Sequence, residues 1–229
     1  MKKINHIIQY TIIGTLFILF KLIGYKASSN LGYLIGKFFG PLFRSKKIVF
    51  KKIKESKITN DNSEIEKIIN NMWGNYGRIL SEYVFLEGFR KGNLEKYLNI
   101  SGLEYLNEIK KKNIPVVFIS GHFNNFELMA MQIEKSGLEL GAIYRPLNNF
   151  FLNSTMENIR KKFICRNQIK KGLSGIREIL NLFKKNISIA LMIDQRVTEG
   201  IKSNFFNQEA LTTTIPAQLV KKYNCEVVP

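Results

Sequence analysis

The chain has 229 residues, of which 45% are hydrophobic and 12% aromatic, enough to bury a sizeable core and to exclude an intrinsically disordered protein. Its formal net charge of +17, from 35 basic and 18 acidic residues, favours an anionic partner such as nucleic acid, anionic lipid headgroups or an acidic carrier protein. The two cysteines, Cys165 and Cys225, lack the spacing of a metal site, so we expect unpaired thiols in a reducing compartment.

The N-terminal segment, residues 1–28, is predicted to be a membrane anchor helix. Fourteen uncharged and mostly apolar residues run from Ile7 to Phe20. As a helix they span about 21 Å, which is short of a hydrocarbon core of about 30 Å. If Lys21 reaches back to the interface, the apolar stretch extends to Tyr25 and becomes just long enough. The alternative is a secretory signal, but a clear cleavage motif is missing. More basic residues follow the segment than precede it, which predicts a cytoplasmic main domain.

Two segments after the anchor are expected to be helical. Residues 30–56 mix glycine, aromatic and apolar residues with a basic tail. This is typical of an amphipathic helix that either rests on a bilayer surface or packs against the domain. Residues 61–86 carry large apolar side chains at helical spacing, and we interpret that stripe as core packing rather than a ligand site.

The stretch at residues 116–127, V-V-F-I-S-G-H-F-N-N-F-E, predicts a strand that turns into a helix. Its apolar residues favour a buried strand, and Gly121 allows the chain to turn sharply where that strand ends. Either Asn124 or Asn125 can cap a helix that begins near Phe126.

His122 and Glu127, within this stretch, are candidates for a general-base pair. On one continuous helix their side chains would point about 140° apart, but across a strand-to-helix turn they can meet. The imidazole can then take a proton while the carboxylate orients it and stabilises its charge. The structural alternative is a histidine that caps a loop and a glutamate that compensates the dipole of the helix.

The rest of the chain alternates between apolar runs and helical patterns. Further buried strands are expected at residues 138–144, 187–193 and 225–228. Helices are expected at residues 102–112, 126–136, 151–163, 173–185 and 215–223. This order predicts an α/β fold with a mostly parallel sheet that is flanked by helices on both faces.

Polar residues directly follow three of the predicted strands. They are His122, Arg145 and Asp194. In a parallel sheet the functional residues gather at the carboxyl ends of the strands, because these ends meet at one edge. We therefore expect these three side chains to converge on a single crevice.

Several kinds of catalytic site are absent from the sequence. The nearest match to a nucleophile elbow, G-L-S-G at 172–175, lacks the second glycine at the required place, which argues against a serine hydrolase. His6 lies in the predicted anchor, so only His122 remains, and we expect no metal site. Neither a Walker loop nor a dinucleotide fingerprint is present, and we expect no cofactor.

A His–Glu pair without a nucleophile of its own can still deprotonate a hydroxyl group that the substrate carries. Direct acyl transfer to an acceptor alcohol is therefore the natural reaction. Basic residues near the pair would bind phosphates of the acceptor or the carrier and help to stabilise the oxyanion.

Seven motifs occur in a fixed order along the chain. They are G-H-F-N-N-F-E at 121–127, Y-R-P-L-N-N at 144–149, I-R-K-K-F at 159–163, L-M-I-D-Q at 191–195, N-F-F-N at 204–207, T-T-T-I-P-A-Q-L at 212–219 and V-V-P at 227–229. Together they resemble the late acyltransferases of lipid A biosynthesis, of the lauroyl- and myristoyltransferase type, which have a glycerolipid acyltransferase-like fold. The likeness covers about residues 1–229 and includes the N-terminal membrane segment.

The resemblance implies roles for individual residues. His122 and Glu127 match the catalytic pair of the family, and Arg160 matches an arginine that is catalytic or binds phosphate. Other residues match positions that shape the site or adjoin it. Those that we assign to substrate binding are Arg145, Asp194, Asn125 and Gln195.

The resemblance also implies the substrates and the location. The donor would be an acyl-acyl carrier protein, whose acidic surface suits the basic charge of this chain. The acceptor would be a hydroxyl of a phosphorylated glucosamine disaccharide lipid, a precursor of lipid A that resembles Kdo-lipid IVA. We expect the reaction at the cell inner membrane, with the catalytic domain facing the cytoplasm, and no nucleic-acid partner.

Two departures from the family pattern are visible. The family usually has F-F-G where this chain has Phe205, Phe206 and Asn207, and it usually continues for several dozen residues beyond V-V-P. We therefore expect an acyltransferase domain at residues 29–229 that is shortened at its C-terminus, as a truncated gene product, a natural short form or an incomplete sequence. Two alternatives stay open: an acyltransferase with a phosphoglycerolipid or glycolipid acceptor, and an inactive membrane-tethered protein that binds lipid.

Overall fold

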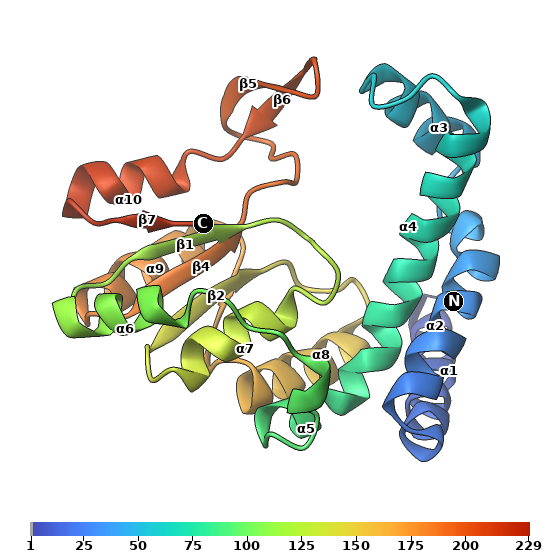
Figure 1. Cartoon of the computed structure of the whole chain (residues 1–229), viewed down its shortest axis with the longest axis horizontal. Coiled ribbons are helices and arrows are strands. Elements are labelled where there is room, and N and C mark those ends of the chain that lie inside the picture. Colours follow the sequence, from blue (N-terminus) through green and yellow to red (C-terminus); the bar gives the residue numbers. More distant parts are fainter. Residues whose placement is uncertain (1) are drawn as a thin grey trace. The chain divides into compact units, whose positions relative to one another are not determined.

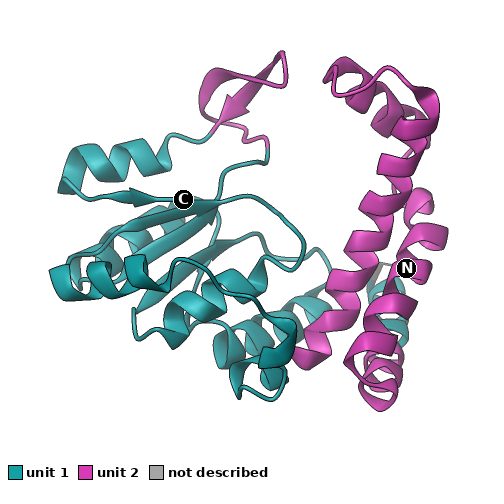
Figure 2. Ribbon diagram, viewed as in Figure 1, with its two compact units in different colours: residues 1–13, 86–195, 213–229 teal, residues 14–85, 196–212 magenta. Residues whose placement is uncertain are grey.

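The computed structural model describes residues 2–229 (Figure 1). The chain divides into two compact units (Figure 2). Unit 1 comprises the chain up to Ile13, residues 86–195 and residues 213–229, and unit 2 comprises residues 14–85 and 196–212. The first helix, α1 (Lys2–Ile23), has its beginning in unit 1 and the rest in unit 2.

Unit 1 contains a five-stranded sheet in which all paired strands run parallel, in the order β3-β2-β4-β1-β7 (Figure 1). The strands are β1 (Val117–Ser120), β2 (Leu140–Tyr144), β3 (Asn167–Lys170), β4 (Ser188–Met192) and β7 (Val227–Val228). Since β4 is inserted between β1 and β2, the carboxyl ends of β1 and β4 are neighbours. The candidate site lies at these two neighbouring strand ends.

Helices cover both faces of this sheet. They are α5 (Leu86–Arg90), α6 (Leu103–Lys112), α7 (Glu127–Lys135), α8 (Phe150–Phe163), α9 (Leu173–Lys184) and α10 (Ile215–Tyr223), with a 3₁₀ turn, η3, at Glu95–Tyr97. Successive side chains of β1 point to opposite faces. Val117 packs with Ile179 of α9 and Leu219 of α10 in one buried cluster. Phe118 lines a groove with Ile109 of α6 and residues of α7 on the other face.

Unit 2 consists of packed helices and one β-hairpin. Its elements are α2 (Tyr25–Phe39), η1 (Gly40–Leu42), α3 (Lys46–Glu55), α4 (Asn62–Glu82), η2 (Tyr83–Phe85), β5 (Ile201–Phe205) and β6 (Gln208–Thr212). The strands β5 and β6 pair antiparallel.

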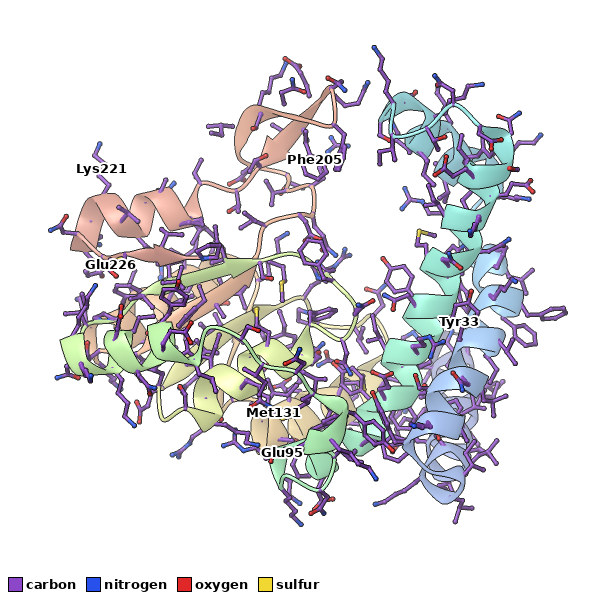
Figure 3. The ribbon with its side chains drawn as sticks, viewed as in Figure 1. Tyr33, Glu95, Met131, Phe205, Lys221 and Glu226 are labelled. Atoms are coloured by element: carbon purple, nitrogen blue, oxygen red, sulfur yellow. The ribbon has the colours of Figure 1, made fainter. Side chains whose placement is uncertain are left out.

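Glycines allow α2 and α4 to approach each other closely. A Cβ atom added at Gly32 or Gly36 of α2, or at Gly77 of α4, would overlap the backbone of the opposite helix. A polar contact accompanies this packing, because the hydroxyl of Tyr33, which is labelled in Figure 3, donates to the side-chain oxygen of Asn71 at 2.8 Å. The two helices therefore meet along a narrow face of α2.

The structure confirms the predicted α/β fold and its parallel sheet, with an apolar helix at the N-terminus. Within residues 2–229, α1 is the one helix that is long and apolar enough to cross a membrane. Neither β3 nor the β5–β6 hairpin was predicted. The predicted cap of α7 is wrong, since its N-cap residue is Phe126, without a capping side chain, and Asn124 adopts a left-handed backbone with φ of 41°.

Candidate active site

The candidate site lies where β1 and β4 end. Ser120 of β1 pairs in register with Met192 of β4. The backbone N–H of Ile193 donates to the carbonyl of Ser120 at 2.9 Å, which continues the pairing to the end of the strands. His122 and Asp194 each come two residues after the paired positions, so parallel pairing brings an imidazole and a carboxylate side by side.

Asp194 holds His122 through two hydrogen bonds. The backbone N–H of His122 donates to Oδ2 at 2.7 Å, and Nδ1 of the ring lies 2.7 Å from Oδ1. Partial burial acts to raise the pKa of the Asp194 carboxyl, but the hydrogen bonds from His122 outweigh it and keep that pKa below its ordinary value. The carboxylate is therefore ionised at neutral pH and fixes the neutral ring as the tautomer that donates from Nδ1.

This tautomer leaves Nε2 of His122 as a proton acceptor. The side-chain amide of Gln195 lies 3.3 Å from Nε2 and can donate to it. The ring of Phe126 packs edge-on against the imidazole, with 4.8 Å between ring centroids and an interplanar angle of 74°. The ring of His122 is thus held from several sides. An acceptor hydroxyl that uses the lone pair of Nε2 must displace the Gln195 amide.

Glu127, the first residue of α7, forms an ion pair with Arg160 of α8. The Nε and Nη2 atoms of Arg160 donate to Oε1 at 2.8 and 2.6 Å. The two side chains are 7% and 17% exposed for Glu127 and Arg160, respectively. Because both charges are largely removed from water, removing either side chain would break a buried ion pair.

Tyr144, at the end of β2, supports the guanidinium of Arg160. That guanidinium lies over the tyrosine ring, 5.5 Å from its centroid, and the Tyr144 hydroxyl donates to Glu157 at 2.7 Å. Burial and the adjacent Glu157 carboxylate raise the pKa of Tyr144. Hydrogen bonds from Lys161 and Tyr144 lower the pKa of Glu157 to about 2. The tyrosine stays protonated and the glutamate ionised at neutral pH, which keeps the ring in place.

The predicted site residues fall into two groups. His122, Asp194 and Gln195 form one cluster, and Glu127 pairs with Arg160. The sequence assigned the orienting carboxylate to Glu127 and placed Asp194 among the substrate-binding residues. The carboxylate that is hydrogen-bonded to Nδ1 belongs to Asp194. His122 and Asp194 each follow an apolar strand at the same distance along the chain. That pattern could have identified Asp194 as the carboxylate that contacts the ring of His122.

Two further predicted residues lie near these groups along the chain. Arg145 directly follows β2, and its side chain is exposed. Asn125 lies in the turn before α7, where its backbone carbonyl accepts from the N–H of Leu128 at 3.1 Å. In the part of the chain that the structure describes, no group of three or more His, Cys, Asp or Glu side chains could hold a metal ion.

An apolar groove of about 900 Å³ runs along α6, α7, β1 and β7. Its apolar lining includes Leu98, Ile100, Leu103, Leu106, Ile109, Phe118, Ile119, Leu128, Met129, Ile133 and Val228. Ile119 lies three residues before His122, and Leu128 directly follows Glu127. The strand end and the helix start that carry the candidate site therefore also contribute to the lining of the groove.

Comparison with known proteins gives one family. The sequence model described as bacterial lipid A biosynthesis acyltransferase matches residues 1–229, the whole chain. A comparison with curated proteins gives no significant match. The family match includes every residue of the candidate site and all the helices of unit 2.

Proposed function

Given that the chain belongs to the bacterial lipid A biosynthesis acyltransferases, we propose that it is an O-acyltransferase with acyl-acyl carrier protein as its donor. The family implies transfer of an acyl group other than aminoacyl, with a lipid A precursor as acceptor. In our proposal the acceptor is a hydroxyl of a precursor that resembles Kdo-lipid IVA. The observation that carries the proposal is the hydrogen bond between Asp194 and Nδ1 of His122, because it prepares Nε2 to accept a proton.

In the proposed reaction His122 acts as the general base. Its Nε2 takes the proton of the acceptor hydroxyl while the hydroxyl oxygen attacks the thioester carbonyl carbon of the donor. The new carbon–oxygen bond forms, the carbon–sulfur bond breaks, and the imidazolium returns its proton to the departing thiolate. Asp194 stabilises the imidazolium and keeps the ring oriented throughout.

We keep Glu127 among the proposed catalytic residues, where it acts through its ion pair with Arg160 and not directly on His122. A guanidinium has several N–H donors, so Arg160 can bind Glu127 and an anion at once. We propose that Glu127 holds Arg160 at the site, where the guanidinium binds a phosphate of the acceptor or stabilises the oxyanion. Arg145, Asn125 and Gln195 are proposed to contact the substrates.

The apolar groove is proposed to hold the fatty acyl chain. Its volume of about 900 Å³ and its aliphatic lining suit a hydrocarbon ligand. A donor whose thioester lies beside His122 could extend its chain past Ile119 and Leu128 into the groove. The depth of the groove would then select the length of the chain that is transferred.

The location that we propose is the cell inner membrane, with the catalytic residues on the cytoplasmic side. Support comes from α1, which is long and apolar enough to cross a bilayer. The basic residues that follow α1 outnumber those before its apolar stretch, which favours a cytoplasmic main domain.

The test of the proposed function uses carrier protein loaded with a labelled acyl chain, together with Kdo-lipid IVA. We expect transfer by the unchanged protein and by His6→Ala, which alters the only other histidine, and no transfer by His122→Ala. Transfer only to a phosphoglycerolipid or a glycolipid would reassign the acceptor. Lipid binding without any turnover would contradict an active enzyme and support an inactive lipid-binding protein.

A further inference from the structure

A second surface, in unit 2, uses none of the residues proposed for acyl transfer. Large apolar side chains are exposed in the last turns of α2 and just beyond it, with Phe38 76% and Phe43 83% exposed. Exposed basic side chains are interspersed with them. We call this surface the apolar–basic patch, and its residues are Leu34, Lys37, Phe38, Leu42, Phe43, Arg44 and Lys47.

The packing of α2 explains why its apolar side chains stay exposed. Gly32 and Gly36 lie against α4. Residues two positions further along a helix are rotated by about 200°, so Leu34 and Phe38 point away from that contact. The small residues of α2 are used for packing inside unit 2, whereas its large apolar residues remain at the surface.

The cations of the patch form no ion pair among the described residues. No acidic residue precedes Glu55 in the chain, whereas 11 basic residues do. Lys46 pairs with Glu66 at 2.8 Å, but within residues 2–229 no carboxylate pairs with Lys37, Arg44 or Lys47. Exposed aromatic and aliphatic side chains with uncompensated cations between them fit a partner that offers both hydrocarbon and negative charge.

A small pocket shares Arg44 with the patch. It has a volume of about 370 Å³, and its lining includes Arg44 and Lys52 as cations, with Trp73 and Tyr76 as aromatic walls. Lys52 already pairs with Glu55 at 2.7 Å, so Arg44 is the cation of this pocket that has no carboxylate partner among the described residues and can bind a phosphate oxygen.

We propose that the apolar–basic patch is a second bilayer contact, distinct from α1 and selective for anionic phospholipid. Leu34, Phe38, Leu42 and Phe43 enter the boundary between headgroups and acyl chains, and Lys37, Arg44 and Lys47 contact headgroup phosphates. One such phosphate lies at Arg44, beside the small pocket. This contact does not depend on acyl transfer, so an inactive chain would keep it.

The first test measures insertion at Phe43 in the full chain. A cysteine at Phe43→Cys carries a polarity-sensitive fluorophore, and Leu173→Cys, whose position on α9 is 84% exposed, serves as the matched control. The unsubstituted chain gives the background from the buried Cys165 and Cys225. On phosphatidylglycerol vesicles we expect a blue-shifted emission, quenched by spin-labelled lipid, for the label at position 43 alone. Equal emission at both positions, with the protein fully bound to vesicles, would overturn the proposal.

The second test separates charge from apolar contact. The triple variant Lys37→Glu, Arg44→Glu, Lys47→Glu should weaken the insertion of the label at least about fivefold for each reversed charge. The control triple is Lys184→Glu, Lys185→Glu, Lys221→Glu, which changes the net charge equally; Lys221 points away from α10 in Figure 3. The control should insert normally.

Three results would overturn the selective contact. They are equal insertion on phosphatidylcholine vesicles, equal loss in both triples, and a blue shift that depends on protein concentration without any vesicle. The last result would assign the patch to self-association instead. Vesicle flotation of each variant monitors binding through α1, so a loss of overall attachment cannot be mistaken for a loss of this contact.

Discussion

Replacing Asp194 with asparagine should invert the tautomer of His122 while preserving the shape of the site. The carboxylate accepts one hydrogen bond from the backbone N–H of His122 and one from its ring. Asparagine has one carbonyl oxygen and one NH₂ group, and the backbone N–H can only donate, so the oxygen must face the backbone. The NH₂ group then donates to Nδ1, which moves the proton of the neutral ring to Nε2.

The expected loss of kcat follows from the proton that has moved to Nε2. A ring that carries its proton on Nε2 cannot take another from the acceptor hydroxyl. In the serine protease triad the same substitution, through the same tautomer effect, lowers kcat by about ten-thousandfold. We therefore expect Asp194→Asn to lower kcat by about a thousand- to ten-thousandfold, or about 4 to 5.5 kcal/mol of transition-state stabilisation. KM should change little, because the two side chains have the same shape.

The assay is single-turnover transfer from a labelled acyl donor with enzyme in excess, which reports the chemical step. Asp61→Asn is the matched control, because Asp61 is the only other aspartate and caps α4 by accepting from the N–H of Ser63 at 2.9 Å. Asparagine caps a helix equally well, so this control should keep the unchanged rate. The double variant with His122→Ala should be no slower than His122→Ala alone.

Two outcomes would refute this reasoning. The first is a single-turnover rate for Asp194→Asn within about threefold of that of the unchanged protein. If Nε2 is the base, the substitution should lower this rate by about 10³-fold. The second is a raised KM with an unchanged kcat, which would make Asp194 a binding residue and nothing more.

Three further predictions follow from the packing of the site, the groove and unit 2. Glu127→Gln should lower the free energy of unfolding by about 3 to 5 kcal/mol, because it breaks the buried ion pair with Arg160; a loss below about 1 kcal/mol in denaturant unfolding would contradict this. Met129→Trp should fill part of the groove and shift the preference toward shorter acyl donors in a competition assay, and an unchanged preference would place the chain elsewhere. Gly77→Ala should destabilise the protein by about 1 to 3 kcal/mol, because the added Cβ would overlap the backbone of α2. The control Gly14→Ala should not destabilise it, since a Cβ there would meet nothing within 4 Å. Equal melting temperatures of the two variants would exclude close packing of α2 and α4.

The parallel sheet could be predicted because its central strands are buried on both faces and therefore read as continuous apolar runs. The edge strand β3, N-Q-I-K, has only Gln168 and Ile169 buried, which is too short a pattern to recognise. The strand β5 is exposed along its whole length, so it carries no apolar pattern at all. The strands that were missed have few buried side chains, and their structure depends on hydrogen bonds to a neighbouring strand.

The residues that form the site could be predicted more fully than the contacts between their side chains. Glu127 lies five residues from His122, whereas Asp194 lies 72 residues away, so proximity along the chain favoured Glu127. The order of strands decides which carboxylate meets the ring, and no local pattern encodes the insertion of β4 beside β1. Similarly, the spacing of Gly32 and Gly36 is visible in the sequence, but their partner helix is not.

The central claim, that His122 keeps its proton on Nδ1 and offers Nε2 as the base, can be measured by nitrogen NMR of isotopically labelled histidine. The chain has two histidines, so His6→Ala assigns the signals. At a pH where the ring is neutral, we expect a protonated Nδ1 and an unprotonated Nε2, with the reverse in Asp194→Asn. A neutral wild-type ring that carries its proton on Nε2 would contradict the proposed mechanism.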